Sequence, residues 1–172
     1  MHDLNLFVWN HDMTAKLEAY VSSAENTDLA KTSDWQTNWS SKAARGMPNK
    51  VALRRSDGNE LLGLMSYEID RGALAVEIIY LESAAHSNAN LLSITGQGKK
   101  YIGIAKALIA YAAKVSVDSG FDGVLFFKAK TDELRKYYMR EFGAMPVSRY
   151  DPYRLVIWED AAAEILSEYE GA

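Results

Sequence analysis

Three runs of alternating apolar residues, joined by short polar links, constrain the fold of this chain more than any other feature. The runs cover 50–56, 60–70 and 73–83, and the links are Asp57-Gly58-Asn59 and Arg71-Gly72. Glycine and asparagine readily adopt the backbone angles of tight turns, so each link can reverse the chain. The three runs therefore predict an antiparallel meander of three strands.

The chain before the meander shows both the alternation of a strand and the apolar spacing of helices. An alternating run at 4–9 predicts a short strand. Apolar residues at helical spacing predict a helix over 12–26, and a more polar helix is expected over 28–44. Trp35 and Trp39 lie one helical turn apart in that second segment, and we interpret them as part of a core face rather than a substrate floor.

Beyond the meander, strands alternate with helices. Apolar spacing predicts a helix over 102–120, and the continuous apolar run at 123–129 is typical of a strand covered on both faces. A capped helix is expected over 131–143, then a strand at 153–159 and a short amphipathic helix over 160–170. A strand, a helix and a second buried strand in succession predict a parallel crossover.

Composition is typical of a globular protein. The chain has 172 residues, 48% of them hydrophobic and 24% charged, and we expect a single domain over 1–172. No apolar run is long enough to cross a bilayer and no signal-type core follows the start, so we expect a cytoplasmic protein with no membrane partner. The absence of cysteine excludes thiolate metal sites, and no metal is expected. A net charge of −4 argues against a general affinity for nucleic acid.

The glycine-rich stretch GQGKKYIGIAKAL at 96–108 is a candidate for binding phosphate. It is not a dinucleotide fingerprint, because Tyr101 stands where the third glycine would belong. It is not a P-loop, because Ile104 and Ala105 follow Gly103 where lysine and a hydroxyl residue would be required. What remains is a positive residue followed by two residues with little or no side chain. This pattern allows backbone N–H groups at a helix start to face an anion.

The remaining pattern, Lys100-x-x-Gly103-x-Ala105, resembles the acyl-CoA signature of the GNAT N-acetyltransferase superfamily, in which Arg or Gln holds the first position. The predicted order of elements resembles that family over most of the chain. The resemblance implies an α+β fold whose mixed sheet combines the antiparallel meander with one parallel strand-helix-strand crossover, flanked by helices. It also implies direct transfer of an acetyl group from acetyl-CoA to an amine, with no covalent enzyme intermediate.

The resemblance further implies where acetyl-CoA binds. Its pyrophosphate would lie on the backbone amides of residues 100–105, and its pantetheine arm would extend from the end of the third meander strand. The binding residues expected on this basis are Leu81, Ser83, Gly98, Lys100, Tyr101, Ile102, Gly103, Ile104, Ala105 and Lys106.

Direct transfer needs a base for the amine and a proton donor for the departing thiolate. Glu82, at the end of the third meander strand, is the first candidate base, and His86 is the second. For the donor, the family often has a tyrosine four residues before the glycine that ends the next helix, but Met139 occupies that position relative to Gly143. Tyr138 takes the role if the helix ends with a one-residue insertion, although its spacing also fits a core position.

The acceptor is left open by the sequence. The resemblance places the acceptor wall at the first two helices and the loop 84–95. A primary amine of a small molecule or protein is the leading candidate. The alternatives are a toxin-like enzyme that acetylates aminoacyl-tRNA and a non-catalytic acyl-CoA-binding module. The resemblance also favours a homodimer.

Overall fold

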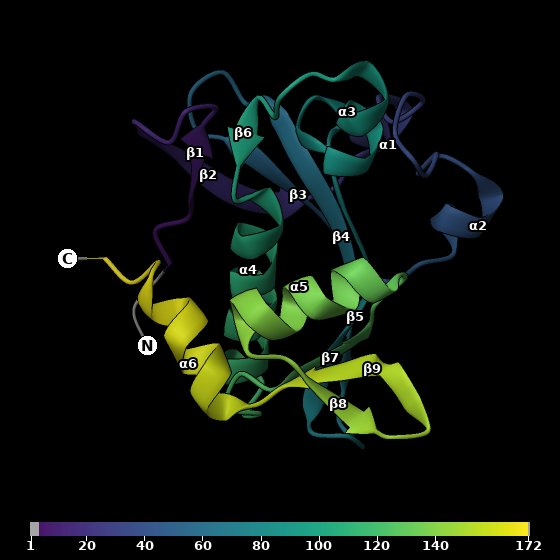
Figure 1. The fold of residues 1–172 in the computed structure, drawn as a ribbon, viewed down its shortest axis with the longest axis vertical. Coiled ribbons are helices and arrows are strands. Elements are labelled where there is room, and N and C mark those ends of the chain that lie inside the picture. The colour runs from purple at the N-terminus through teal and green to yellow at the C-terminus, as the bar shows by residue number, and fades with distance from the viewer. Residues whose placement is uncertain (1–3, 172) are drawn as a thin grey trace. The chain divides into compact units, whose positions relative to one another are not determined.

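The computed structural model describes residues 4–171, which form two compact units. The N-terminal unit comprises 5–66 and 80–108, and the C-terminal unit comprises 67–79 and 109–171 together with Leu4. Both units receive residues from strands β4 (Leu61–Asp70) and β5 (Ala75–Ser83) and from helix α4 (Ile104–Asp118). Figure 1 labels these elements along the chain.

The N-terminal unit is built on antiparallel strand pairs in the order β6-β1-β2-β3-β4-β5. Its further elements are β1 (Phe7–Asn10), β2 (Lys16–Ser23), α1 (Asn26–Ala30), α2 (Lys42–Arg45), β3 (Lys50–Arg55), the 3₁₀ turn η1 (Ala85–Ser87), α3 (Ala89–Thr95) and β6 (Tyr101–Ile102). Strand β3 pairs antiparallel with β4, with Lys50 opposite Ser66. The first two strands of the predicted meander are therefore confirmed as neighbours.

The C-terminal unit contains a parallel strand pair. Its strands follow the order β4-β5-β7-β9-β8. Its further elements are β7 (Leu125–Lys128), α5 (Asp132–Phe142), β8 (Met145–Ser148), β9 (Asp151–Ile157) and α6 (Glu159–Ser167). Val76 of β5 lies opposite Leu125 of β7 in parallel register, whereas β9 runs antiparallel to β7 and β8. The chain passes from β5 through α4 to β7, so the predicted parallel crossover is confirmed.

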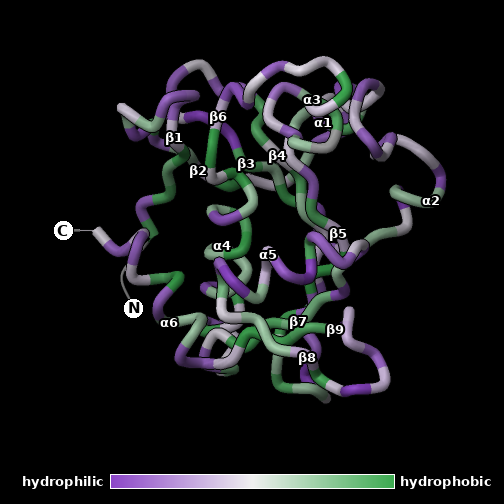
Figure 2. The backbone as a smooth tube through the Cα atoms, in the orientation of Figure 1, coloured by the Kyte–Doolittle hydropathy of each residue, from purple (hydrophilic) through white to green (hydrophobic). Residues whose placement is uncertain are grey.

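The mixed α+β fold class is confirmed, and local sequence explains several of its elements. Figure 2 shows hydrophobic colour along β7 and much hydrophilic colour along α5. Helix α5 begins after Thr131, whose hydroxyl accepts the N–H of Leu134 at 3.1 Å, and ends at Gly143 in the left-handed conformation. These caps lie where the sequence predicts them.

The helix predicted over 12–26 is wrong, because this part of the chain forms strand β2. Strand β2 pairs with β1 on one edge and with β3 on the other, so its backbone N–H and C=O groups have partners on both sides. Ala19 is 8% exposed and the adjacent Tyr20 is 38% exposed, as expected of a strand with one covered face. This pairing outweighs the helical spacing of a few apolar residues.

The helix predicted over 28–44 is also wrong. Between α1 and α2 the chain is irregular over 31–41, which we call the tryptophan segment. Its polar side chains compete with helix formation; for example, Asn38 Oδ1 accepts the backbone N–H two residues later at 3.0 Å. Trp35 and Trp39 are nevertheless buried, with 9% and 0% exposed, so their interpretation as core residues is confirmed.

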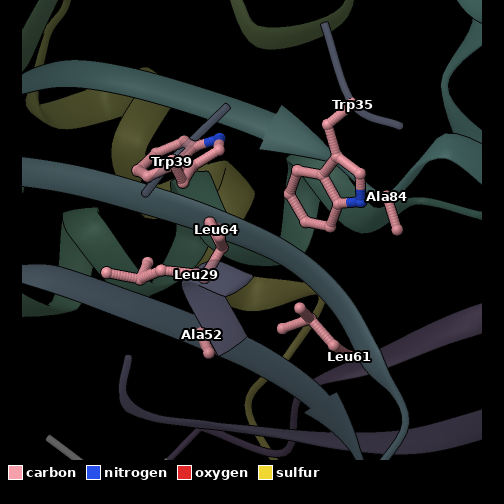
Figure 3. Close-up of a cluster of buried hydrophobic side chains, with 7 residues drawn as sticks. All are labelled: Leu29, Trp35, Trp39, Ala52, Leu61, Leu64 and Ala84. Atoms are coloured by element: carbon pink, nitrogen blue, oxygen red, sulfur yellow. The ribbon is translucent and has the colours of Figure 1, made fainter. Parts of the chain in front are cut away.

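The two tryptophans belong to one cluster of buried side chains in the N-terminal unit, drawn in Figure 3. Its members are Leu29, Trp35, Trp39, Ala52, Leu61, Leu64 and Ala84. They come from α1, the tryptophan segment, β3, β4 and the residue that follows β5. The cluster therefore packs a segment without regular secondary structure against the sheet.

Strands β6 and β8 and the short helix α3 are not predicted from the sequence. Strand β6 has two residues and β8 has four, so neither carries enough alternation to be recognised. Helix α3 lies in the region that the sequence analysis treats as loop.

The close approach of α4 to β4 depends on Gly63. A Cβ atom on Gly63 would lie 2.8 Å from Cγ2 of Ile104, 3.0 Å from the carbonyl oxygen of Glu82 and 3.1 Å from Cδ1 of Leu108. We expect Gly63→Ala to lower the free energy of unfolding by about 1–3 kcal/mol, because these neighbours must move away. Urea denaturation measures the change.

Gly98→Ala is the matched control for this substitution. Among the described residues no atom lies within 4 Å of a Cβ placed on Gly98, and its φ is outside the left-handed region. We expect this variant to be as stable as the parent. Equal stability of Gly63→Ala and the parent would contradict the close packing.

Candidate functional site

The predicted phosphate cradle lies where β6 ends and α4 begins. Gly103 joins the two elements with a φ of +94°, a left-handed conformation that glycine adopts without strain. Among the described residues, the one atom within 4 Å of a Cβ placed on Gly103 is Cδ1 of Trp9, at 4.0 Å. The first N–H groups of an α-helix have no acceptor within the helix, so the start of α4 presents donors to an anion beside Gly103.

Two backbone amides of the predicted cradle are already bonded within the N-terminal unit. The N–H of Lys100 donates to the carbonyl of His86 at 2.9 Å, and the N–H of Tyr101 donates to Oγ of Ser87 at 2.9 Å. The donors that remain for an anion therefore begin beyond Tyr101. The two bonded amides instead fix the position of the chain that leads into Gly103.

Glu60, directly before β4, contacts several polar side chains near the cradle. We call Arg55, Glu60, His86, Lys100 and Tyr101 the Glu60 cluster. The Glu60 carboxylate accepts the ammonium of Lys100 at 2.8 Å and the hydroxyl of Tyr101 at 2.5 Å. Arg55 Nη1 donates to the Tyr101 hydroxyl at 3.3 Å. These contacts connect the start of β4 to the chain that enters the cradle.

The charged groups of the Glu60 cluster shift one another's pKa values. Partial burial would raise the pKa of Glu60, but the bonds from Lys100 and Tyr101 outweigh burial and hold it below its ordinary value. The same bond, which Lys100 donates to Glu60, raises the pKa of Lys100. Glu60 and Lys100 are therefore both ionised at neutral pH, and Lys100 is engaged in an ion pair.

His86, the second candidate base, lies in η1 and is enclosed by this cluster. Its Nδ1 is 2.6 Å from Oγ of Ser87, and its Nε2 is 3.4 Å from Oε2 of Glu60. Burial lowers the pKa of His86, although the Glu60 charge acts in the opposite direction, so the ring is neutral at neutral pH.

Glu82, the first candidate base, anchors the tryptophan segment. Its side chain is 4% exposed, and its carboxylate accepts the backbone N–H of Gln36 at 2.7 Å and that of Thr37 at 3.2 Å. It also accepts Nε1–H of Trp39 at 3.1 Å. Because N–H donors stabilise negative charge, these contacts favour a buried carboxylate whose lone pairs are engaged. The role of Glu82 as a base stays a prediction, and the contacts add a structural role.

The anchoring contacts predict the effect of Glu82→Gln on stability. An amide in place of the carboxylate would turn an NH₂ group toward backbone and indole donors, so at least one N–H would lose its acceptor. We expect the free energy of unfolding to fall by about 1–3 kcal/mol, measured by urea denaturation. Glu68→Gln, at an exposed position of β4, is the control and should change little. A Glu82→Gln variant as stable as the parent would contradict the anchoring role.

The other predicted binding residues of the N-terminal unit differ in exposure. Leu81 and Ser83 flank Glu82 in β5 and are half-buried. Gly98 is exposed, and Ala105 and Lys106 are half-buried in the first turn of α4. Ile102 is half-buried in β6, and Ile104 is 2% exposed. The side chain of Ile104 therefore serves packing, and only its backbone is suited to a ligand.

Tyr138, the candidate proton donor, belongs to the C-terminal unit and is described within it. Its ring meets Phe127 edge-on with centroids 4.9 Å apart, and it also contacts Phe142. Burial raises the pKa of Tyr138 to about 12. The hydroxyl therefore keeps its proton at neutral pH, as a proton donor must.

The end of α5 is wider than an ordinary helical end. The N–H of Gly143 donates to the carbonyl of Tyr138, five residues earlier, rather than to that of Met139. The N–H of Ala144 bonds to the same carbonyl at 3.3 Å. An i→i+5 bond accommodates one extra residue in the last turn. The role of Tyr138 as proton donor stays a prediction.

Glu60 and the anchoring of the tryptophan segment are not predicted from the sequence. For Glu60 a signal was present, because a charged residue begins the otherwise apolar run ELLGLM. For the tryptophan segment no local signal exists, because its contacts with Glu82 span more than forty residues. Within residues 4–171, no group of acidic or histidine side chains is arranged to hold a metal ion, and no helix is long and apolar enough to span a membrane.

The sequence matches no family model, and no curated protein is significantly similar to it. The structure is similar to a tyrosine-to-phenylalanine mutant of the toxin AtaT bound to the C-terminus of the antitoxin AtaR. The TM-score is 0.58 and the identity 14%, with 87% of this chain and 98% of that chain covered. A GNAT-family acetyltransferase from Listeria monocytogenes gives a TM-score of 0.54 and 15% identity, with 81% and 94% covered. The AtaT mutant bound to AtaR and acetyl-CoA gives 0.51 and 14%, with 86% and 97% covered.

At such low identity, these similarities concern the fold. They extend over nearly the full length of each neighbour. They also cover more than four fifths of this chain. This chain contains the parallel crossover from β5 through α4 to β7 and the antiparallel strands β2 to β4. The chain therefore has the fold of the GNAT acetyltransferases.

Proposed function

We propose that the protein is an acetyl-CoA-dependent N-acetyltransferase that transfers an acetyl group directly to a primary amine of a small molecule or protein. The observation that carries this proposal is Gly103, left-handed and open on its side-chain side, at the start of α4 in a GNAT fold. The fold alone is compatible with many activities, whereas this cradle favours a ligand with phosphate groups.

The residues at the cradle fit acetyl-CoA. A phosphate can approach the backbone at Gly103 because no side chain fills the space, and the helix dipole of α4 favours negative charge there. In the proposal, the amides from Gly103 to Lys106 bind the pyrophosphate, and β5 at Leu81 and Ser83 binds the pantetheine arm. Acetyl-CoA supplies the activated acetyl group when it is bound.

Proton transfer is assigned to three side chains. Glu82 and His86 are the candidate acceptors of the amine proton, and Tyr138 is the donor to the departing thiolate. Because burial lowers the pKa of His86, its ring is ready to accept a proton at neutral pH. Glu82→Gln and His86→Ala, assayed from pH 6 to 9, tell the two apart, because high pH partly replaces a lost base by supplying deprotonated amine.

Gly103→Glu tests the cradle. The substitution places a side chain and a negative charge where the pyrophosphate is proposed to lie, so we expect the affinity for acetyl-CoA to fall at least tenfold, or about 1.4 kcal/mol, in calorimetry. Gly58→Glu is the matched control, because Gly58 has a similar φ of +82° but lies in the turn between β3 and β4. Equal affinities of Gly103→Glu and the parent would exclude the cradle.

Tyr138→Phe tests the proton donor. We expect turnover to fall about 10²-fold or more, with acetyl-CoA affinity unchanged, because only the hydroxyl is removed. Since the pKa of Tyr138 is raised to about 12, the parent should show no loss of activity up to pH 10 from ionisation of this group. Tyr137→Phe is the control on the same helix. A loss confined to Tyr137→Phe would transfer the role to Tyr137.

A second candidate acceptor is the amino group of aminoacyl-tRNA. It is favoured by the similarity of the fold to AtaT, which is a toxin. Incubation with labelled acetyl-CoA and cell lysate, followed by separation into protein, RNA and metabolites, distinguishes the acceptors. Label in RNA would support the second candidate, and absence of label from every fraction would favour a non-catalytic acyl-CoA-binding module. A homodimer is also proposed, and light scattering at several concentrations tests it.

A further inference from the structure

Strands β1 and β2 carry two aromatic rings and a lysine that the proposed function does not use. We call Phe7, Trp9 and Lys16 the aromatic face. Phe7 and Trp9 are half-buried on one face of β1, whereas Val8 between them is fully buried on the other. The two rings meet edge-on with centroids 5.8 Å apart. The ammonium of Lys16 lies 4.5 Å from the Phe7 centroid and 5.5 Å from the Trp9 centroid.

The aromatic face adjoins the cradle through strand register. Trp9 lies opposite Lys16 of β2 on one side and opposite Ile102 of β6 on the other. The chain continues from Ile102 directly into Gly103, and Cδ1 of Trp9 is 4.0 Å from the position of a Gly103 Cβ. The indole therefore borders the open side of Gly103. A group covalently attached to a phosphate at Gly103 is within reach of the aromatic face.

The chemistry of the aromatic face matches one end of coenzyme A. From its pyrophosphate, coenzyme A extends as the pantetheine arm in one direction and as adenosine 3′-phosphate in the other. Adenine stacks on aromatic rings, and an ammonium group pairs with a phosphate. The register places Lys16, and not the acidic Glu18, opposite Trp9, so the charge beside the indole is positive.

We propose that the aromatic face binds the adenosine 3′-phosphate end of acyl-CoA, with the Trp9 indole stacking on adenine and the Lys16 ammonium pairing with the 3′-phosphate. This inference rests on the proposed function, because it requires the pyrophosphate to lie at Gly103. It extends that function by assigning nucleotide recognition to β1 and β2, far in the sequence from the glycine-rich stretch.

Calorimetry with three ligands tests the inference on the full chain. The ligands are coenzyme A, 3′-dephospho-coenzyme A and 4′-phosphopantetheine, which lacks the nucleotide. We expect the parent to bind coenzyme A about tenfold more tightly than the dephospho form, and Lys16→Gln to bind both equally. We expect Trp9→Ala to bind both nucleotides about tenfold more weakly than the parent, with unchanged affinity for phosphopantetheine.

Conservative variants and controls keep the result interpretable. Trp9→Phe retains a ring and should keep most of the affinity, whereas quenching of tryptophan fluorescence by coenzyme A should disappear in that variant. Lys42→Gln, on the exposed side of α2, and Trp158→Ala, where the side chain is 51% exposed, should bind like the parent.

The outcomes separate this inference from the proposed function. If the parent binds coenzyme A but Trp9→Ala and Lys16→Gln bind it equally well, the inference is overturned and the proposed function stands. An equal loss of phosphopantetheine affinity in Trp9→Ala also overturns it, because the damage would then concern the cradle. If the parent binds none of the three ligands, the proposed function fails and the inference fails with it.

Discussion

The hydrogen bonds to the buried carboxylate of Glu82 are the interaction on which the rest of the N-terminal unit depends. The tryptophan segment has no regular secondary structure, so its backbone N–H groups need acceptors from elsewhere. Glu82 supplies acceptors for Gln36, Thr37 and the indole of Trp39. A carboxylate is well suited to this task because it accepts several bonds and donates none when ionised. The core cluster of Figure 3 can then include both tryptophans.

The Glu60 cluster similarly holds the chain that leads into the cradle. Strand β6 has two residues, so backbone pairing with β1 alone holds it weakly. The amides before Gly103 bond to η1, and the side chains of Lys100 and Tyr101 bond to Glu60. Glu60 is half-buried and Lys100 is exposed, so solvent screens their ion pair and its direct contribution to stability is modest. Its main effect is to fix where the left-handed glycine and the start of α4 lie.

The sequence predicts the elements whose signals are local. Strands β4 and β5 follow from alternation, α4 follows from apolar spacing, and the caps of α5 are visible as Thr131 and Gly143. The predictions are wrong where contacts with residues distant in sequence determine the local structure. Strand β2 is a strand because β1 and β3 flank it, and the tryptophan segment is irregular because Glu82 can serve its amides.

In the candidate site, too, some residues are predicted from local sequence, whereas other contacts depend on the fold. Gly103 is predicted from sequence because a phosphate cradle needs a residue without a side chain at that spacing, and the structure shows it left-handed and open on its side-chain side. Glu60 cannot be connected to Lys100 and Tyr101 from sequence, because these contacts join residues about forty positions apart. Glu82 and His86, whose roles stay predictions, likewise contact Trp39 and Glu60, residues that only the fold brings close.

The last turn of α5 contains a backbone bond that spans five residues, and this geometry bears on the predicted role of Tyr138. One residue rotates a side chain by about 100° around a helix, so a tyrosine five residues before the closing glycine would ordinarily face another direction than one four residues before it. The bond from Gly143 to the carbonyl of Tyr138 spans five residues and absorbs the additional one in the last turn. The carbonyl of Tyr138 therefore accepts the bond that the carbonyl of Met139 would accept in an ordinary α-helical turn, which concerns the backbone and not the direction of the Tyr138 ring. The packing of the Tyr138 ring against Phe127 and Phe142 and its pKa of about 12 fit a core residue as well as a proton donor, so the role of Tyr138 stays a prediction that Tyr138→Phe tests.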